Sequence, residues 1–113
     1  MPAKPETVSS LYLEACLLAN TETQLGISPR PPFEVGHRKS LRAQAEKVAN
    51  EARRLRGLDQ TSLDTDKVWA ARKAVAAAQK LLNAVNEFNN PPKDPEIIFK
   101  AIDAAIVALK ALP

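Results

Sequence analysis

The sequence contains little cysteine, histidine or aromatic side chain, and each shortage excludes a class of protein. Its single cysteine, Cys16, cannot form a disulfide within the chain. Together with the single histidine, His37, it cannot supply the ligands of an ordinary zinc site. Only five residues are aromatic, so a core would consist mainly of Leu, Val, Ile and Ala. We therefore expect no bound metal and no cofactor.

Long apolar runs are also missing from the chain. No stretch approaches the roughly 18 apolar residues that cross a bilayer. The first residues lack the succession of basic residues, apolar run and small cleavage-site residues that marks a secretory signal. The 113 residues suit one domain, 1–113, and 45% hydrophobic with 26% charged residues is typical of a soluble globular protein. We expect a single cytoplasmic domain that does not contact a membrane.

Four segments carry apolar residues at the three- and four-residue spacing of a helix that buries one face. These segments are 5–25, 37–56, 64–88 and 95–112. No segment has the alternating pattern of a half-buried strand. For the first three segments, the predicted core residues are Val8, Leu11, Ala15, Leu18 and Leu25; Leu41, Ala45, Val48, Ala52 and Leu55; and Val68, Ala71, Val75, Ala78, Leu82 and Val85.

Capping residues mark where these helices begin and end. Asp64 and Asp94 are favourable N-caps, and Gly26 and Gly57 suit C-terminal caps. Residues 26–36 contain three prolines and a glycine at each end, which predicts an extended connector. The sequence therefore predicts an all-α fold, an antiparallel four-helix bundle with a Pro-rich connector between its first and second helices.

Trp69 departs from the helical pattern of its segment. On a helix with about 100° per residue, it lies about 170° from the centre of the apolar face, beside Arg72 and Lys73. An indole in this position either packs under the stems of basic side chains or anchors a protein interface, where Trp and Arg are enriched. The first interpretation needs no function, and the second makes all three residues part of a binding surface.

The apolar residues exceed what one small bundle covers easily. Segment 95–112 is apolar on nearly every side, with Val107 among its few charged residues, and Leu13 and Leu17 lie away from the main face of segment 5–25. A helix that is apolar all round is normally buried, either inside the bundle or against a second subunit. Twofold dimers are the commonest assembly, so we expect a homodimer.

Basic residues are concentrated in segment 30–56, which has eight Lys and Arg against three Glu. Four of its arginines fall within about 60° of arc and span about 27 Å along a helix, a row that can follow a phosphate backbone. These arginines are Arg38, Arg42, Arg53 and Arg56. Glu46 interrupts the row at the ion-pair spacing from Arg42, so a solvated charged face is the competing interpretation.

Six residues separate Arg30 from His37, which stands at the predicted start of the second helix. This spacing resembles the Arg–His pair of HEPN domains, a superfamily of small helical ribonucleases. In that family the pair lies in the later half of the bundle, whereas here it comes early and includes two prolines between its members. The resemblance implies a metal-independent ribonuclease in which His37 acts as a general acid–base.

The sequence as a whole predicts a non-enzymatic helical module that binds another protein and its own copy. The predicted interface residues are Trp69, Arg72, Lys73 and Val107. The first alternative is a nucleic-acid-binding protein that uses the arginine row, and the second is the HEPN-like ribonuclease. Phosphate binding weakens steeply with salt and apolar association does not, so salt dependence separates the first two hypotheses.

Overall fold

The computed structural model describes the backbone of residues 3–27 and 31–113, and the side chains of 3–20, 31–59 and 61–113. Two 3₁₀ turns, η1 (Val35–His37) and η2 (Gln60–Ser62), precede the second and third α-helices. The described residues include no strand, so the predicted all-α class is confirmed. The four α-helices are α1 (Pro5–Ile27), α2 (Arg38–Arg56), α3 (Thr65–Asn86) and α4 (Pro95–Lys110).

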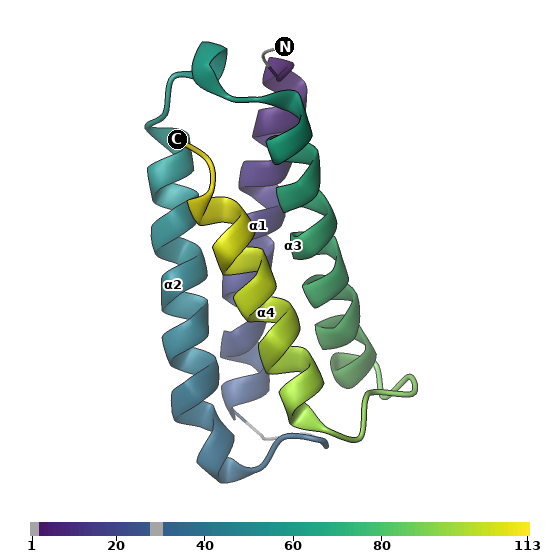
Figure 1. Cartoon of the computed structure of the whole chain (residues 1–113). Coiled ribbons are helices and arrows are strands. Elements are labelled where there is room, and N and C mark those ends of the chain that lie inside the picture. The colour runs from purple at the N-terminus through teal and green to yellow at the C-terminus, as the bar shows by residue number, and fades with distance from the viewer. Residues whose placement is uncertain (1–2, 28–30) are drawn as a thin grey trace.

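The four helices lie side by side in a body of 42 × 23 × 18 Å (Figure 1). α1 packs against α2 and α3, and α4 packs against the same two helices, so α1 and α4 lie diagonally opposite each other. In Figure 1, α1 and α3 run away from the end of the molecule that carries both chain-end labels, and α2 and α4 run back toward it. Each helix therefore has two neighbours and one outer face.

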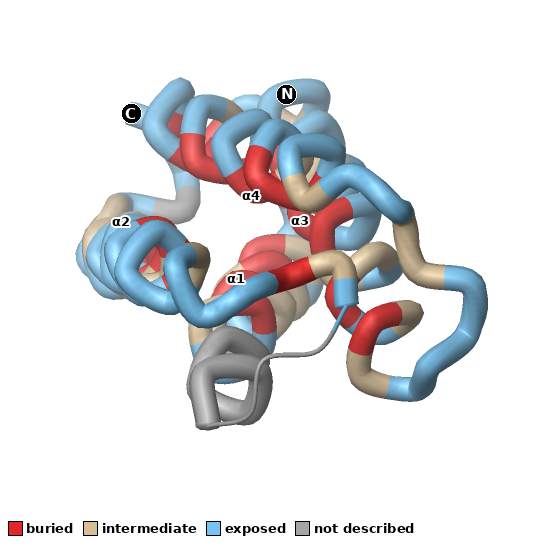
Figure 2. Tube along the Cα trace, turned by 90° about the horizontal axis from the view of Figure 1, so that it is seen from below, coloured by how far each residue is buried: buried red, intermediate tan, exposed pale blue. Residues whose placement is uncertain are grey.

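Buried side chains of the four helices meet in one core, and Figure 2 shows the buried stretches turned toward a common centre. Every predicted core residue of α3 is buried. In α1, the predicted core residues whose side chains are described, Val8, Leu11, Ala15 and Leu18, are buried as well. Leu25 lies outside the residues whose side chains are described. The prediction for Ala45 is wrong, because this residue is only half-buried and Gln44 is buried beside it.

The predicted caps of three helix ends are present. The Asp64 carboxylate accepts a hydrogen bond from the backbone N–H of Lys67 at 3.3 Å, and Asp94 accepts one from Glu96 at 3.0 Å. Gly57 is the C-cap of α2, as predicted. The bonds of Asp64 and Asp94 satisfy backbone donors that a helix leaves without partners in its first turn.

The predictions for the connector 26–36 are wrong in two respects. Gly26 lies within α1 rather than after it, a difference within the one or two residues by which helix ends vary. The end of the connector is not extended, because Val35–His37 form a 3₁₀ turn. The Nδ1 atom of His37 accepts the backbone N–H of Glu34 at 2.9 Å and closes this turn. Residues 28–30 lie outside the described residues.

α3 ends at Asn86, two residues before the predicted end at Phe88. Phe88 takes a left-handed conformation with φ of 52°, which terminates the helix. Its N–H donates to the carbonyl of Val85 at 3.3 Å, and the N–H of Asn89 donates to that of Ala84 at 2.9 Å. These two bonds form a Schellman motif, in which Phe88 occupies the position that usually holds glycine.

Within the part of the chain whose side chains are described, three side chains make polar bonds between helices that are not consecutive in the sequence. Gln44 of α2 donates through Nε2 to the carbonyl of Phe99 at 3.0 Å and to Asp103 Oδ1 at 2.8 Å, both on α4. Arg54 of α2 donates to the carbonyls of Leu112 at 2.8 Å and Leu109 at 2.7 Å, at the end of α4. The third, Arg72 of α3, bonds to α1.

Candidate interaction surface

Trp69 lies in the first turns of α3, and its side chain remains 47% exposed. The guanidinium carbon of Arg72, one turn further along α3, lies 4.8 Å from the centre of the indole ring. A cation over an aromatic face is attracted by the negative charge density of the ring. One face of the indole is therefore covered by Arg72 while much of the side chain stays in contact with solvent.

Arg72 is held in place by Glu14 of α1. Its Nε donates to Glu14 Oε1 at 2.9 Å and its Nη2 donates to Oε2 at 3.2 Å, so the pair is bidentate. The hydrogen bonds from Arg72 to this carboxylate raise the pKa of Arg72 above its usual value. Because two parallel bonds fix the guanidinium plane, the pair of Arg72 and Glu14 links α1 and α3 at a defined position and holds Arg72 against the Trp69 ring.

Two hollows follow the line between α1 and α3 and together form one groove. Both hollows are shallow and open to solvent, with volumes of about 230 Å³ and about 270 Å³, and both are lined by Glu14 and Ala76. Leu17 of α1 lines the second hollow. We call these joined hollows the α1–α3 groove, and its lining residues on α3 are Trp69, Arg72, Lys73, Val75, Ala76, Gln79, Lys80 and Asn83.

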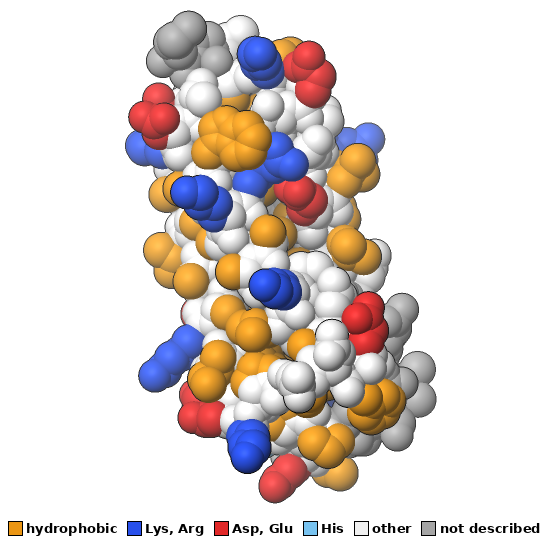
Figure 3. Space-filling model, turned by 90° about the vertical axis from the view of Figure 1, so that its right-hand side faces the viewer, with side chains coloured by type: hydrophobic (Ala, Val, Ile, Leu, Met, Phe, Trp, Pro, Cys, Tyr) orange, Lys and Arg blue, Asp and Glu red, His pale blue; other side chains and the backbone are white. Residues whose placement is uncertain are grey.

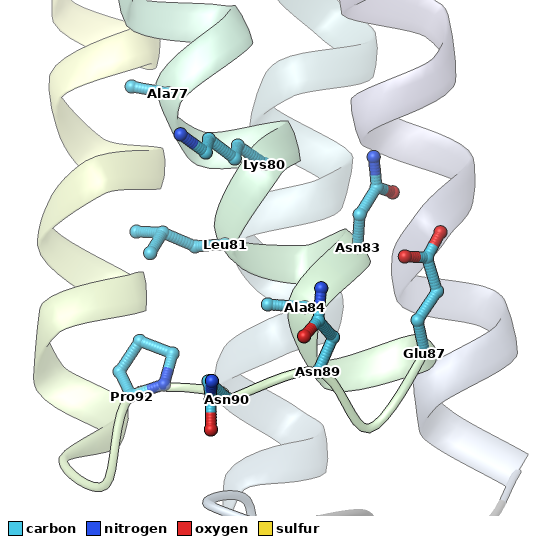
Figure 4. Close-up of a pocket in the computed structure, with 9 residues that line it drawn as sticks. All are labelled: Ala77, Lys80, Leu81, Asn83, Ala84, Glu87, Asn89, Asn90 and Pro92. Atoms are coloured by element: carbon cyan, nitrogen blue, oxygen red, sulfur yellow. The ribbon is translucent and has the colours of Figure 1, made fainter.

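A third hollow, of about 720 Å³, continues from the groove toward the turn between α3 and α4. It shares Lys80 and Asn83 with the groove. Figure 4 shows that Leu81 points toward α4 at this level, whereas Asn83 and Glu87 point toward the side of α1. The side of the molecule over α3 thus carries exposed apolar side chains with both basic and acidic side chains between them (Figure 3).

The predicted interface residues fall into two places. Trp69, Arg72 and Lys73 line the same hollow, as their spacing on one helix requires. Val107 is 67% exposed, but it belongs to α4, which lies diagonally opposite α1 and contributes no lining residue to the groove. Leu13, which is also exposed, lies on α1 one residue before Glu14. The exposed apolar residues therefore lie on at least two sides of the molecule.

The arginine row lies along α2, and its four members, Arg38, Arg42, Arg53 and Arg56, are exposed. Arg53 donates a hydrogen bond to Asn50, and the guanidinium of Arg56 lies 6.0 Å from the ring centre of Tyr12 on α1. Arg54, which lies between Arg53 and Arg56 in the sequence, does not belong to this row, because its guanidinium bonds to the carbonyls of Leu109 and Leu112 at the end of α4. Local contacts thus occupy part of the basic face.

His37 is half-buried at the start of α2, and its ring packs against Phe33 and Phe99 at centroid distances of 6.1 and 5.5 Å. Its Nδ1 already accepts the Glu34 N–H, so only Nε2 is left for other chemistry. Arg30, the other member of the predicted ribonuclease pair, lies outside the described residues.

Glu14 is a lining residue whose role sequence reasoning missed, and Lys80 was likewise not among the predicted interface residues. Glu14 lies 58 residues before Arg72, so no helical spacing connects the two. Within the described ranges, no group of three or more His, Cys, Asp or Glu side chains could hold a metal ion. None of the described helices is both long and apolar enough to span a membrane.

Comparison of the chain with models of known families, with curated protein sequences and with solved structures gave no match.

Proposed function

We propose that this chain is a non-enzymatic helical module that binds another protein through the α1–α3 groove. The observation that carries the proposal is the exposed indole of Trp69 beside that groove. Trp and Arg are the residues most enriched at the energetic centres of protein interfaces. Because Arg72 is already fixed by Glu14, a partner that packs on this pair orders few further side chains, which reduces the entropy cost of binding.

The proposal includes the architecture of an antiparallel four-helix bundle and a Pro-rich connector as a spacer before α2. The directions of the helices in Figure 1 and the two neighbours of each helix support the bundle. A site built on packed helices keeps its geometry better than one built on loops. Such a bundle suits a module whose task is to present one fixed surface.

We also propose that the module forms a homodimer and acts in the cytoplasm. Val107 on α4 supports self-association, since it is an exposed apolar residue away from the groove. The free thiol of Cys16 suits the cytoplasm, where thiols are kept reduced.

Site-specific photocrosslinking in cells that produce the protein tests the proposed function. A photoreactive residue replaces Lys73 at the groove, and a control variant carries it in place of Lys47, which is exposed on α2. We expect a protein adduct from position 73 that survives nuclease treatment and is lost when Trp69→Ala is added. Adducts that form equally from position 47, or that persist without the indole, would contradict the proposal.

The exposed arginine row supports nucleic-acid binding as a second candidate function. This candidate requires that Arg38→Glu and Arg42→Glu together abolish binding to a random-sequence duplex and that binding weaken steeply as salt increases. Binding to the groove, by contrast, requires Trp69 and none of the arginines on α2. The variants Arg38→Glu with Arg42→Glu, on the one hand, and Trp69→Ala, on the other, therefore separate the two functions.

A further inference from the structure

We infer that the partner of the α1–α3 groove is an acidic amphipathic helix that carries two carboxylates seven residues apart. This inference rests on the proposed function, because it specifies the partner chemistry of the same groove. It is argued from the length of the groove, the nature of its surface and the arrangement of charge along its rim.

The groove has the length and surface that a helix needs. Its lining residues on α3 run from Trp69 to Asn83, which corresponds to about 21 Å, or about four helical turns. Trp69 and Leu17 supply bulky apolar surface along it, and Ala76, common to both hollows, adds only a methyl group. A small residue between two larger ones lets a docked helix approach closely with apolar residues at three- and four-residue spacing.

The charges along the groove differ in whether they are already paired. Glu14 and Arg72 neutralise each other within the chain. Lys73 and Lys80 are exposed, and in the described part of the chain neither has a carboxylate within ion-pair distance. They are seven positions apart in the sequence, so they project from the same side of α3 about 10.5 Å apart. A helix lying along α3 matches both lysines when its carboxylates have the same seven-residue spacing.

A second copy of the chain fits this groove less well. A twofold contact of groove against groove would bring the lysines of both copies together, and like charges at an interface cost free energy. The outer side of α4 does carry Glu96 and Asp103 seven residues apart, but Asp103 already accepts a hydrogen bond from Gln44. α4 lies diagonally opposite α1, so its outer side and the groove cannot face the same neighbouring copy. Insertion of α4 into the groove of another copy would therefore be a head-to-tail contact that does not close into a twofold dimer.

The test uses the full chain and a displayed library of amphipathic helices of about 18 residues. Each helix has a fixed apolar stripe, and two positions seven residues apart beside the stripe are varied among Glu, Gln and Lys. We expect selection to enrich Glu at both positions. The selected helices, made as peptides, should bind a Lys73→Glu, Lys80→Glu variant at least about tenfold more weakly. A control variant with Lys39→Glu and Lys47→Glu has the same net charge, and it should bind like the unchanged chain.

The outcomes separate this inference from the function on which it rests. Enrichment of Gln or Lys, in helices whose binding is still lost with Trp69→Ala, overturns the acidic partner and leaves the proposed function standing. A library without any helix that depends on Trp69 overturns the helical partner, whereas the proposed function is overturned only by loss of the Trp69-dependent crosslink at position 73. A dimer of the chain alone that dissociates with Trp69→Ala also overturns the inference, because a second copy then occupies the groove.

Discussion

Exposing an indole to water is unfavourable, and a cation that covers one face of the ring reduces this cost. At Trp69 the covering cation is Arg72, and cation–π contacts at exposed sites contribute about 0.5–1 kcal/mol. Arg72 has its own partner in Glu14, so its position does not depend on the indole. The ring thus adds surface for binding without being part of the core.

Trp69→Ala should therefore lower the free energy of unfolding by less than about 2 kcal/mol, compared with about 3–5 kcal/mol for a core Trp. The emission of the unchanged chain should resemble that of a solvated indole. Urea unfolding and a fluorescence spectrum make both measurements, with Leu82→Ala in the core of α3 as the control that loses about 2–5 kcal/mol. Blue-shifted emission together with a loss as large as the control's would show that Trp69 belongs to the core.

Phe88 is a second residue whose position has an energetic consequence. A side chain in the left-handed region crowds its own backbone, and glycine at this C-terminal position avoids that cost. Phe88→Gly should have a free energy of unfolding about 1 kcal/mol higher than that of Phe88→Ala, measured by thermal or urea unfolding. Phe88→Ala is the matched control, because it removes the ring and keeps the β-carbon. Equal stability of the two variants would mean that the backbone is not strained there.

At the scale of helices, the features predicted from the sequence are those that depend on neighbouring residues. The caps Asp64, Asp94 and Gly57 act on backbone groups within a few positions, and apolar spacing reports the buried face of the same helix. The burial of Gln44 and the role of Glu14 could not be predicted, because their partners lie 55 or more residues away. The sequence analysis places Val107 in one interface with Trp69 for the same reason, because residue spacing does not show which helices lie diagonally opposite each other in the bundle.

Arg54 shows what a bond between distant helices contributes. Its guanidinium donates to two carbonyls at the end of α4 and forms an ion pair with Glu51 of its own helix at 2.9 Å, and its side chain is 36% exposed. We expect Arg54→Ala, which removes all of these contacts, to cost about 1–2 kcal/mol. The neighbouring Arg53 bonds only locally to Asn50 among the described contacts, and Arg53→Ala should change stability by less than about 0.5 kcal/mol. Urea unfolding compares the two, and equal losses would show that the carbonyl bonds add nothing.

The turn between α2 and α3 provides a pH-dependent interaction. Asp59 accepts the backbone N–H of Thr61 at 3.0 Å and its hydroxyl at 2.8 Å, and these bonds hold the pKa of Asp59 below its usual value. A lowered pKa means that this stabilisation is present above the unfolded-state pKa and is lost as pH falls through the folded-state value. Thr61→Val removes only the hydroxyl bond, so an NMR titration should show the pKa rising part of the way. An unchanged pKa would exclude the hydroxyl as a cause.

At the scale of the whole molecule, the exposed apolar residues lie on separate sides. Leu17 and Trp69 line the α1–α3 groove, whereas Val107 lies on α4, diagonally opposite α1. In the function that we propose, one side meets a partner helix while the other meets a second copy. An adaptor needs this separation, because two partners that compete for one surface cannot be brought together.

Sedimentation at tens of micromolar should give about twice the monomer mass of 12.3 kDa. Val107→Glu should return the chain to a monomer, since burying an unpaired charge in an apolar contact is costly. Trp69→Ala should leave the dimer intact, because the groove lies on another side of the molecule. A monomer at this concentration would remove self-association and leave the apolar residues of α4 as ordinary surface.

The polar bonds of Gln44, Arg54 and Arg72 also bear on the order of events in folding. All three join helices that are not consecutive, whereas α1 with α2 and α3 with α4 form hairpins that close shorter loops. Contacts that are close in sequence form at lower entropic cost, so we expect the hairpins to form first and these bonds to form when the hairpins meet. Weakening Arg54 should then speed unfolding and leave the refolding rate nearly unchanged. The lifetime of the native state and the speed at which it is reached are thus set by different residues.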